Sequence, residues 1–164
     1  MSAVSDVPPF DITSLAGRVA QRQRDRERRR NSTFPVPLKG YEDLFVPQYR
    51  RLTQLELSQL QERPGSADGN NWALDVLINA STDIVDVTGD GANQPLGWRW
   101  NAATISRLFG VQLDDNCSAR QALATALSSD EVLEHASAYF KAREAIMEED
   151  AAAVAGESEP SAEG

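Results

Sequence analysis

The stretch of sequence that decides the fold is NNWALDVLINASTDIVDV, which spans residues 70–87. Its apolar residues recur every three or four positions, which is typical of a helix with one buried face. That face comprises Ala73, Leu77, Ala80 and Ile84. An asparagine stands at each of the first two positions and is a favourable N-cap. We therefore expect the most apolar helix of the chain here, at the centre of the core.

Two short strands are expected on either side of the segment after this helix, TGDGANQPLG, residues 88–97. The segment is rich in glycine, aspartate and asparagine, which is typical of a turn. In residues 98–100 two tryptophans flank Arg99, an alternation that is typical of a strand. We expect this strand to pair with residues 85–87.

The same segment partly matches a calcium-binding loop that would begin at Asp86. Asp86, Thr88 and Asp90 occupy its first, third and fifth positions, and a glycine stands at the sixth. The twelfth position normally holds a glutamate that binds calcium through both oxygens, but here it is Gly97. We therefore interpret the segment as a turn and predict no metal site.

On the N-terminal side, residues 33–53 read TFPVPLKGYEDLFVPQYRRLT and predict extended chain. Pro35 and Pro37 exclude a helix and restrict the residues before them to extended angles. Gly40 supplies a turn, and a second apolar run follows it. This pattern predicts a short β-hairpin.

Capping boxes mark the starts of three further helices. The residue pairs are Thr53 with Glu56, Ser118 with Gln121, and Ser128 with Glu131. A short helix is expected to begin at Asn101 and to stop at Gly110. The last helix places near one face Val132, Leu133, Ala136, Tyr139, Phe140, Arg143 and Ile146. The predicted fold class is mainly α with a small β-hairpin (α+β): a compact helical domain with disordered ends.

The two ends of the chain differ in charge from the helical domain at residues 34–147. Residues 1–33 form a basic N-terminal arm, in which residues 18–30 carry seven arginines against two acidic residues. We expect a short amphipathic helix there that passes into a solvated basic one. Residues 148–164 carry six acidic groups and few large apolar residues, so they are expected to form a disordered tail.

Composition and the lack of catalytic motifs argue against an enzyme. The chain of 164 residues has one cysteine, one histidine and a net charge of −9. His135 lies inside a predicted helix without partners for catalysis or metal binding, so we interpret it as a surface or half-buried residue. Cys117 alone forms no internal disulfide, which suits a reducing, intracellular compartment. No apolar run approaches the roughly 18 residues of a membrane span, and we expect no cofactor.

The arginine run admits three interpretations: a solvated charged arm, a docking element for an acidic protein partner, or an RNA-binding helix. The acidic residues within the run weaken the RNA interpretation, as does its lack of aromatic residues to stack on bases. The negative net charge also argues against nucleic acid as a partner. The residues expected to contact a partner are Arg22, Arg26, Arg29, Tyr139 and Phe140.

The order of these segments resembles the tail assembly chaperones of long-tailed (siphovirus-type) actinobacteriophages. In VPLKGYEDLFVPQYRRLTQLELSQL an extended pair ends in a Tyr-Arg-Arg step and leads into a helix, as at the start of those chaperones. The stretches NNWALDVLINASTDIVDV and WRWNAATISRLFGV resemble their central helix and the aromatic-Arg-aromatic step before their short helix. SARQALATALSSDEVLEHASAYFKAREAIM resembles their C-terminal pair of helices. The resemblance covers about residues 34–147.

The resemblance implies a chaperone without catalytic residues, which binds and solubilises the tape measure protein in the host cell cytoplasm until tail-tube subunits replace it. Such a protein would be absent from the mature virion. Surplus apolar helix faces also predict self-association into a homo-oligomer. Two alternatives remain: a small regulator that binds nucleic acid through the arginine run, and a structural head–tail or tail component of the virion.

Overall fold

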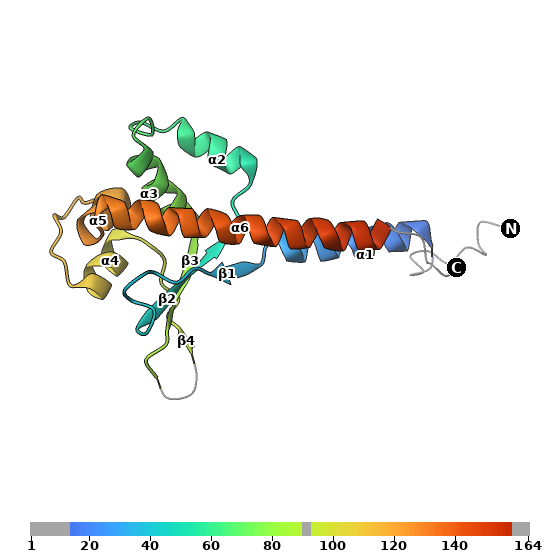
Figure 1. The fold of residues 1–164 in the computed structure, drawn as a ribbon, viewed down its shortest axis with the longest axis horizontal. Coiled ribbons are helices and arrows are strands. Elements are labelled where there is room, and N and C mark those ends of the chain that lie inside the picture. The colour runs from blue at the N-terminus through green and yellow to red at the C-terminus, as the bar shows by residue number, and fades with distance from the viewer. Residues whose placement is uncertain (1–13, 90–92, 159–164) are drawn as a thin grey trace, which may run out of the picture. The chain divides into compact units, whose positions relative to one another are not determined.

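A small antiparallel sheet and several helices make up the fold in the computed structural model, which describes residues 14–89 and 93–158 (Figure 1). Within these residues the sheet has four strands in the order β1-β2-β3-β4. The strands are β1 Thr33–Pro35, β2 Phe45–Arg50, β3 Ser81–Asp86 and β4 Gln94–Pro95. The helices are α1 Leu15–Arg30, α2 Gln54–Gln61, α3 Gly69–Ala80, α4 Ala102–Phe109, α5 Ala119–Ala126 and α6 Ser129–Ser158. The predicted α+β class is confirmed.

The chain divides into two compact units. The first ends at Ser32 and contains α1, and the second begins at Thr33 and contains every other described element. The two helical pieces expected in the basic arm are one continuous helix. Its N-cap is Ser14, whose side-chain oxygen accepts the Gly17 N–H at 3.0 Å. This cap satisfies one of the N–H groups that a helix start leaves without a partner in the helix.

The predicted hairpin is confirmed by β1 and β2, which pair antiparallel with Phe34 opposite Tyr49. Alternate residues of β2 are buried, as a strand with one face on the core requires. β2 also pairs with β3, where Val46 lies opposite Val85. β2 is therefore an inner strand of the sheet.

The prediction that Ile84 belongs to the central helix is wrong. α3 ends at Ala80, and Ile84 lies in β3 opposite Pro47. The chain after Ala80 is rich in β-branched residues, which favour a strand. Ile84 is nevertheless fully buried, so the helical spacing correctly identified a core residue but assigned it to the wrong element.

The predicted pairing of residues 85–87 with residues 98–100 is also wrong. β3 pairs instead with the two-residue β4, and residues 98–100 form no strand. The Trp100 N–H donates to the Ser81 hydroxyl oxygen at 2.9 Å. Because a side chain of β3 binds this backbone donor, the donor is not available for a strand ladder.

The three predicted capping boxes are confirmed. In each, the N-cap side chain accepts the N–H of the third helical residue, and the side chain of that residue accepts the N–H of the N-cap. They are Thr53 with Glu56, Ser118 with Gln121, and Ser128 with Glu131. α4 begins after Asn101 and ends at Gly110, which adopts a left-handed φ of 68°, as predicted. The expected asparagine cap of α3 is wrong, because the Asp68 side chain accepts the Asn70 N–H at 2.9 Å.

Replacing Thr53 with alanine removes the cap of α2. We expect Thr53→Ala to lower the free energy of unfolding by about 1 kcal/mol, because the Glu56 N–H loses its acceptor. Chemical denaturation measures this loss. Ser58→Ala, at an exposed position inside α2, is the matched control and should leave stability unchanged or slightly higher. Equal midpoints for Thr53→Ala and the wild type would show that the cap contributes nothing.

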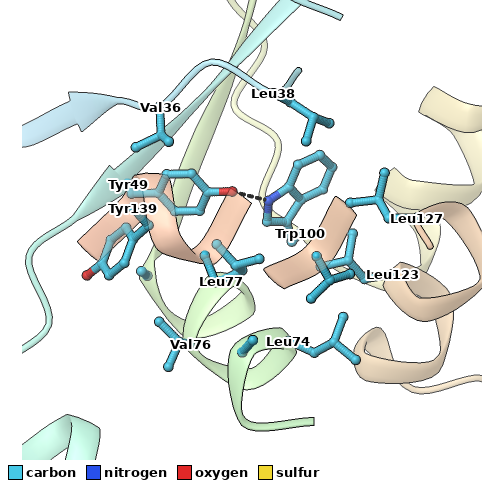
Figure 2. Close-up of a cluster of buried hydrophobic side chains, with 14 of the residues drawn as sticks. Val36, Leu38, Tyr49, Leu74, Val76, Leu77, Trp100, Leu123, Leu127 and Tyr139 are labelled. Carbon is cyan, nitrogen blue, oxygen red and sulfur yellow. Dashed lines mark hydrogen bonds between the residues drawn. The ribbon is translucent and has the colours of Figure 1, made fainter. Parts of the chain in front are cut away.

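The core of the second unit is built around α3, which contacts α2, α5, α6 and β2. This confirms the predicted central position of α3. Figure 2 shows side chains from the sheet and from several helices that pack together around α3. The largest fully buried ones include Tyr49, Tyr139, Leu52, Leu74, Leu77, Ile84, Ile105 and Leu123.

The disordered tail predicted from residue 148 is wrong for residues 148–158, which continue α6. This stretch is rich in alanine, the residue with the highest helix propensity. Asp150 also forms an ion pair with Arg51 at 3.2 Å, which ties this end of α6 to the chain after β2. The predicted disorder of residues 159–164 and of the first residues of the arm lies outside the described residues.

The predicted buried face of α6 is largely correct. Val132, Ala136 and Tyr139 are buried, as their spacing predicts. Leu133 is 47% exposed, so its assignment to this face is wrong. It lies about 100° around the helix from Val132, at the margin of the apolar stripe.

Candidate partner-binding surfaces

One face of α1 carries two exposed apolar residues followed by two exposed arginines. Leu15 is 78% exposed and Val19 is 54% exposed. Arg22 and Arg26 are exposed further along the helix. Their spacing of three or four residues places all four side chains on one face, which we call the α1 stripe. Arg29, the third arginine predicted to contact a partner, is half-buried.

The basic charge of the chain is concentrated on α1. The arginine run there has a net charge of +5, from seven arginines and two acidic residues. Residues 33–164 carry nine basic and 21 acidic residues, a net charge of −12. The α1 stripe therefore suits an amphipathic partner with apolar residues and carboxylates on one face.

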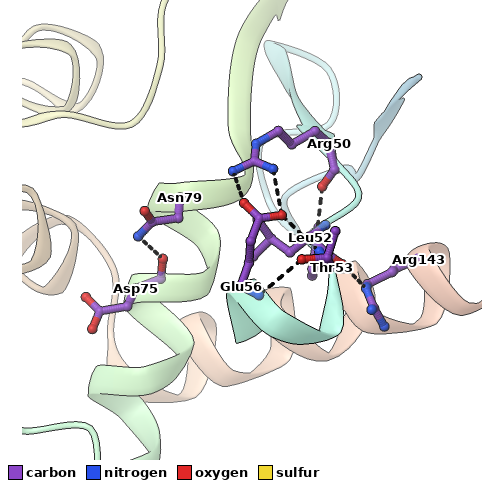
Figure 3. A network of polar contacts seen from close by, with 8 residues as sticks. Arg50, Leu52, Thr53, Glu56, Asp75, Asn79 and Arg143 are labelled. Atoms are coloured by element: carbon purple, nitrogen blue, oxygen red, sulfur yellow. Dashed lines mark hydrogen bonds and ion pairs between the residues drawn. The ribbon is translucent and has the colours of Figure 1, made fainter. Parts of the chain in front are cut away.

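Tyr139, predicted to contact a partner, is fully buried. Its hydroxyl donates to the Arg50 carbonyl at 2.9 Å and accepts the Leu52 N–H at 3.0 Å. Arg143 donates from Nε to the Leu52 carbonyl at 2.9 Å (Figure 3). The prediction for Tyr139 is therefore wrong, because its side chain attaches the link between β2 and α2 to α6.

The Tyr-Arg-Arg step at residues 49–51 has a structural role that its sequence did not reveal. Tyr49 is buried in the core, and Arg51 pairs with Asp150. Arg50 donates through both terminal nitrogens to the Glu56 carboxylate, at 3.1 and 2.7 Å (Figure 3). This hydrogen bonding lowers the pKa of Glu56. Arg50 therefore holds α2, and Tyr49 and Arg51 hold α6, against the end of β2.

Phe140, the other aromatic residue predicted to contact a partner, is half-buried. Its ring stacks on Trp72 of α3, with centroids 5.4 Å apart and an interplanar angle of 11°. The pair packs α6 against α3. A role for Phe140 in partner binding stays a prediction.

His135 is buried, at 4% exposure, which corrects its interpretation as a surface or half-buried residue. It ends a chain of hydrogen bonds that begins at Trp100, whose Nε1–H donates to the Tyr49 hydroxyl oxygen at 2.8 Å. The Tyr49 hydroxyl lies 2.7 Å from His135 Nε2. Since the Tyr49 oxygen already accepts one bond, its own proton is best used toward His135. This places the acceptor on Nε2 and the imidazole proton on Nδ1.

Burial lowers the pKa of His135 to about 4, because the charged imidazolium loses its hydration inside the protein. A hydrogen-bonding contact with the Pro37 carbonyl opposes this shift. Nδ1 is enclosed by the protein and makes no closer hydrogen bond to a described residue. His135 is therefore a buried, neutral side chain that is held mainly through Nε2. No pattern in the sequence signals this contact, because Tyr49 and His135 are 86 positions apart.

A cavity of about 420 Å³ lies beside His135, between the β1–β2 connection and the first half of α6. It is lined by Pro37, Leu38, Lys39, Glu42, Glu131, Glu134, His135 and Ala138. A second cavity, of about 310 Å³, adjoins Asp75. The buried Asp75 carboxylate is bound there by Arg120, from Nε at 3.0 Å and from Nη2, so this cluster is already satisfied by the fold.

No cluster of His, Cys, Asp or Glu side chains suited to a metal lies within residues 14–89 and 93–158. Asp90 of the partial calcium-loop match is outside the described residues. In the described part of the chain, no helix is long and apolar enough to cross a membrane. Comparisons with protein families, with curated proteins and with solved structures find no match to this chain.

Proposed function

We propose that this protein is a non-enzymatic tail assembly chaperone, which binds the tape measure protein and keeps it soluble in the host cell cytoplasm. It self-associates, uses no cofactor and leaves before the virion matures. The observation that carries the proposal is the α1 stripe, an exposed apolar face continued by arginines. The resemblance of residues 34–147 to these chaperones supports the same function.

The α1 stripe has the chemistry that a long helical client requires. Such a client presents apolar residues along its length that are prone to aggregation until they are covered. Burying Leu15 and Val19 against it contributes about 1.5–3 kcal/mol for each side chain that is fully covered. Arg22 and Arg26 then favour a client with carboxylates beside its apolar stripe, which gives the contact an orientation.

Self-association has separate candidate residues in the second unit. Leu55 on α2, and Leu133 and Met147 on α6, are large apolar side chains that are 67%, 47% and 41% exposed. Exposed apolar residues on helices are suitable contacts between copies of a chain. An oligomer would present several α1 stripes to one client and so raise its effective affinity.

Removing the apolar half of the α1 stripe tests the proposal. We expect Leu15→Gln combined with Val19→Gln to reduce the amount of client held in solution at least fivefold, because both apolar contacts are lost. The assay is co-expression with the tape measure protein, followed by measurement of the client in the soluble fraction. Leu44→Gln is the matched control, because Leu44 is an exposed leucine outside both α1 and the proposed self-association contacts. Equal losses in both variants would contradict a specific role for the stripe.

The exposed arginines also favour one competing function, a regulator that binds nucleic acid through α1. Affinity for RNA or DNA that falls steeply with salt, and is lost on Arg22→Gln with Arg26→Gln, would support that regulator. The chaperone proposal predicts that these two substitutions weaken client binding and that the wild type shows no salt-sensitive nucleic-acid complex.

A further inference from the structure

One exposed face of α6, in its C-terminal half, combines carboxylates with small apolar side chains. Its residues follow one another at intervals of three or four positions and so share one face, which we call the α6 stripe: Glu144, Glu148, Ala151 and Ala155. The buried Val132 and Tyr139 lie on the other side of the helix. In the α6 stripe the charged residues come first and the apolar ones second, which is the reverse of their order in the α1 stripe.

The two stripes lie in parts of the chain that carry opposite charge. The arginine run of α1 has a net charge of +5. Residues 144–158, at the end of α6, carry five acidic residues and no basic one, a net charge of −5. Opposite charges of this kind steer two surfaces together and fix their relative orientation. The α6 stripe is therefore a suitable partner for the α1 stripe in charge as well as in shape.

The two stripes match residue by residue when the helices run antiparallel. Successive residues of the α1 stripe are four, three and four positions apart, and the α6 stripe read backwards from Ala155 has the same intervals. The facing pairs are then Leu15 with Ala155, Val19 with Ala151, Arg22 with Glu148, and Arg26 with Glu144. Alternating intervals of four and three are those of a coiled-coil seam. Each large apolar side chain faces a small one, and each arginine faces a carboxylate.

We propose that the α1 stripe of one copy packs antiparallel on the α6 stripe of a second copy, in a two-fold symmetric dimer that forms when the client is absent. The symmetry repeats the contact, because each copy supplies one stripe of each kind. The dimer covers Leu15 and Val19, whose exposed apolar surface favours association. The client then competes with the α6 stripe for the α1 stripe, and the proposal rests on the proposed chaperone function for this step alone.

Reversing the charges on one stripe tests the facing pairs. Arg22→Glu with Arg26→Glu places like charges opposite Glu148 and Glu144, and Glu144→Lys with Glu148→Lys does so from the other side. Sedimentation equilibrium of the wild-type chain should show a dimer with a dissociation constant on the order of 10 μM, as for a small, partly polar interface. Each reversed variant should dimerise at least about tenfold more weakly. All four positions are exposed, so circular dichroism should show unchanged helix content.

An equimolar mixture of the two reversed variants gives the decisive result. In a mixed dimer, one contact pairs glutamates on α1 with lysines on α6, and the other pairs arginines on α1 with glutamates on α6. Both contacts are again attractive, so the mixture should dimerise to within about threefold of the wild type although each variant alone does not. A mixture that stays monomeric would overturn the proposal.

The matched control is Arg24→Glu with Arg28→Glu, which makes the same change in net charge as the reversed α1 stripe. Both arginines are exposed but lie on the other side of α1, so this variant should dimerise as the wild type does. A loss of dimerisation equal to that of the reversed α1 stripe would show a general charge effect and overturn the proposed contact. A wild-type chain that is still monomeric at about 1 mM would overturn it as well.

The client assay separates this proposal from the chaperone function. If the reversed variants recover dimerisation on mixing but the wild type leaves the tape measure protein insoluble, the chaperone function fails and the dimer contact stands. If the wild type solubilises the client but mixing restores no dimer, the dimer contact fails and the chaperone function stands.

Discussion

Replacing Tyr139 with phenylalanine should destabilise the protein by about 2–4 kcal/mol. The hydroxyl of Tyr139 bonds to the Leu52 N–H and to the Arg50 carbonyl, and Leu52 is fully buried. Phenylalanine fills the same space but leaves both backbone groups without this partner, and each unsatisfied group costs about 1–3 kcal/mol. Chemical denaturation measures the change in the free energy of unfolding.

The matched control for Tyr139→Phe is Tyr41→Phe. Tyr41 is half-buried, and its hydroxyl makes no hydrogen bond to the described residues, so its loss should change stability by less than about 0.5 kcal/mol. A loss for Tyr139→Phe no larger than that of the control would mean that the hydroxyl does not hold α6 to the end of β2.

Between pH 6.5 and pH 4, the titration of His135 should lower the free energy of unfolding by about 3 kcal/mol. The pKa of His135 is lowered from 6.5 to about 4 by burial. Between these values the unfolded chain binds a proton that the folded chain does not, so stability falls as pH falls through this window. Below about pH 4 both states are protonated and the contribution of His135 becomes constant. Each unit of the pKa difference is worth about 1.4 kcal/mol.

The comparison that isolates this effect is with His135→Gln, whose side chain does not titrate. The carboxylates that line the cavity with His135 are Glu42, Glu131 and Glu134, and Lys39 accompanies them. Their titration is common to both proteins, so it cancels in the difference between the two stability profiles. Urea denaturation at closely spaced pH values measures the free energy of unfolding of both proteins. The value for the wild type should fall relative to that of His135→Gln as pH falls from 6.5 to 4. Parallel profiles would contradict a buried, neutral His135.

The features that sequence alone predicted are those set by short-range chemistry. The box of Thr53 and Glu56 involves residues three positions apart, and the left-handed Gly110 ends α4 because it has no side chain. Both are confirmed. The hairpin of β1 and β2 is likewise encoded by prolines and a turn glycine within one short segment. The α1 stripe follows from helical spacing, although its exposure required the structure.

The features that sequence did not predict depend on contacts between distant segments. Ile84 continues the spacing of α3 by coincidence, and only its pairing with β2 shows that it belongs to a strand. Tyr139 was assigned to a partner surface because an apolar stripe does not distinguish the core from an interface. Sequence alone predicts a surface or half-buried His135, because its partner Tyr49 is 86 positions away along the chain. The cavity could not be predicted either, because the two segments that line it, residues 37–42 and 131–138, are far apart along the chain.

The most direct test of the proposed chaperone function is the solubility of the tape measure protein that the proposal expects to be encoded beside this chain. That protein would be expressed alone and with the wild-type chain, and the soluble fractions would be resolved by size-exclusion chromatography. The chaperone function predicts an insoluble client when it is alone, and a soluble complex that contains both chains when they are together. A client that is equally insoluble in both cases, with no complex eluting, would contradict it and leave nucleic-acid binding through α1 as the leading function.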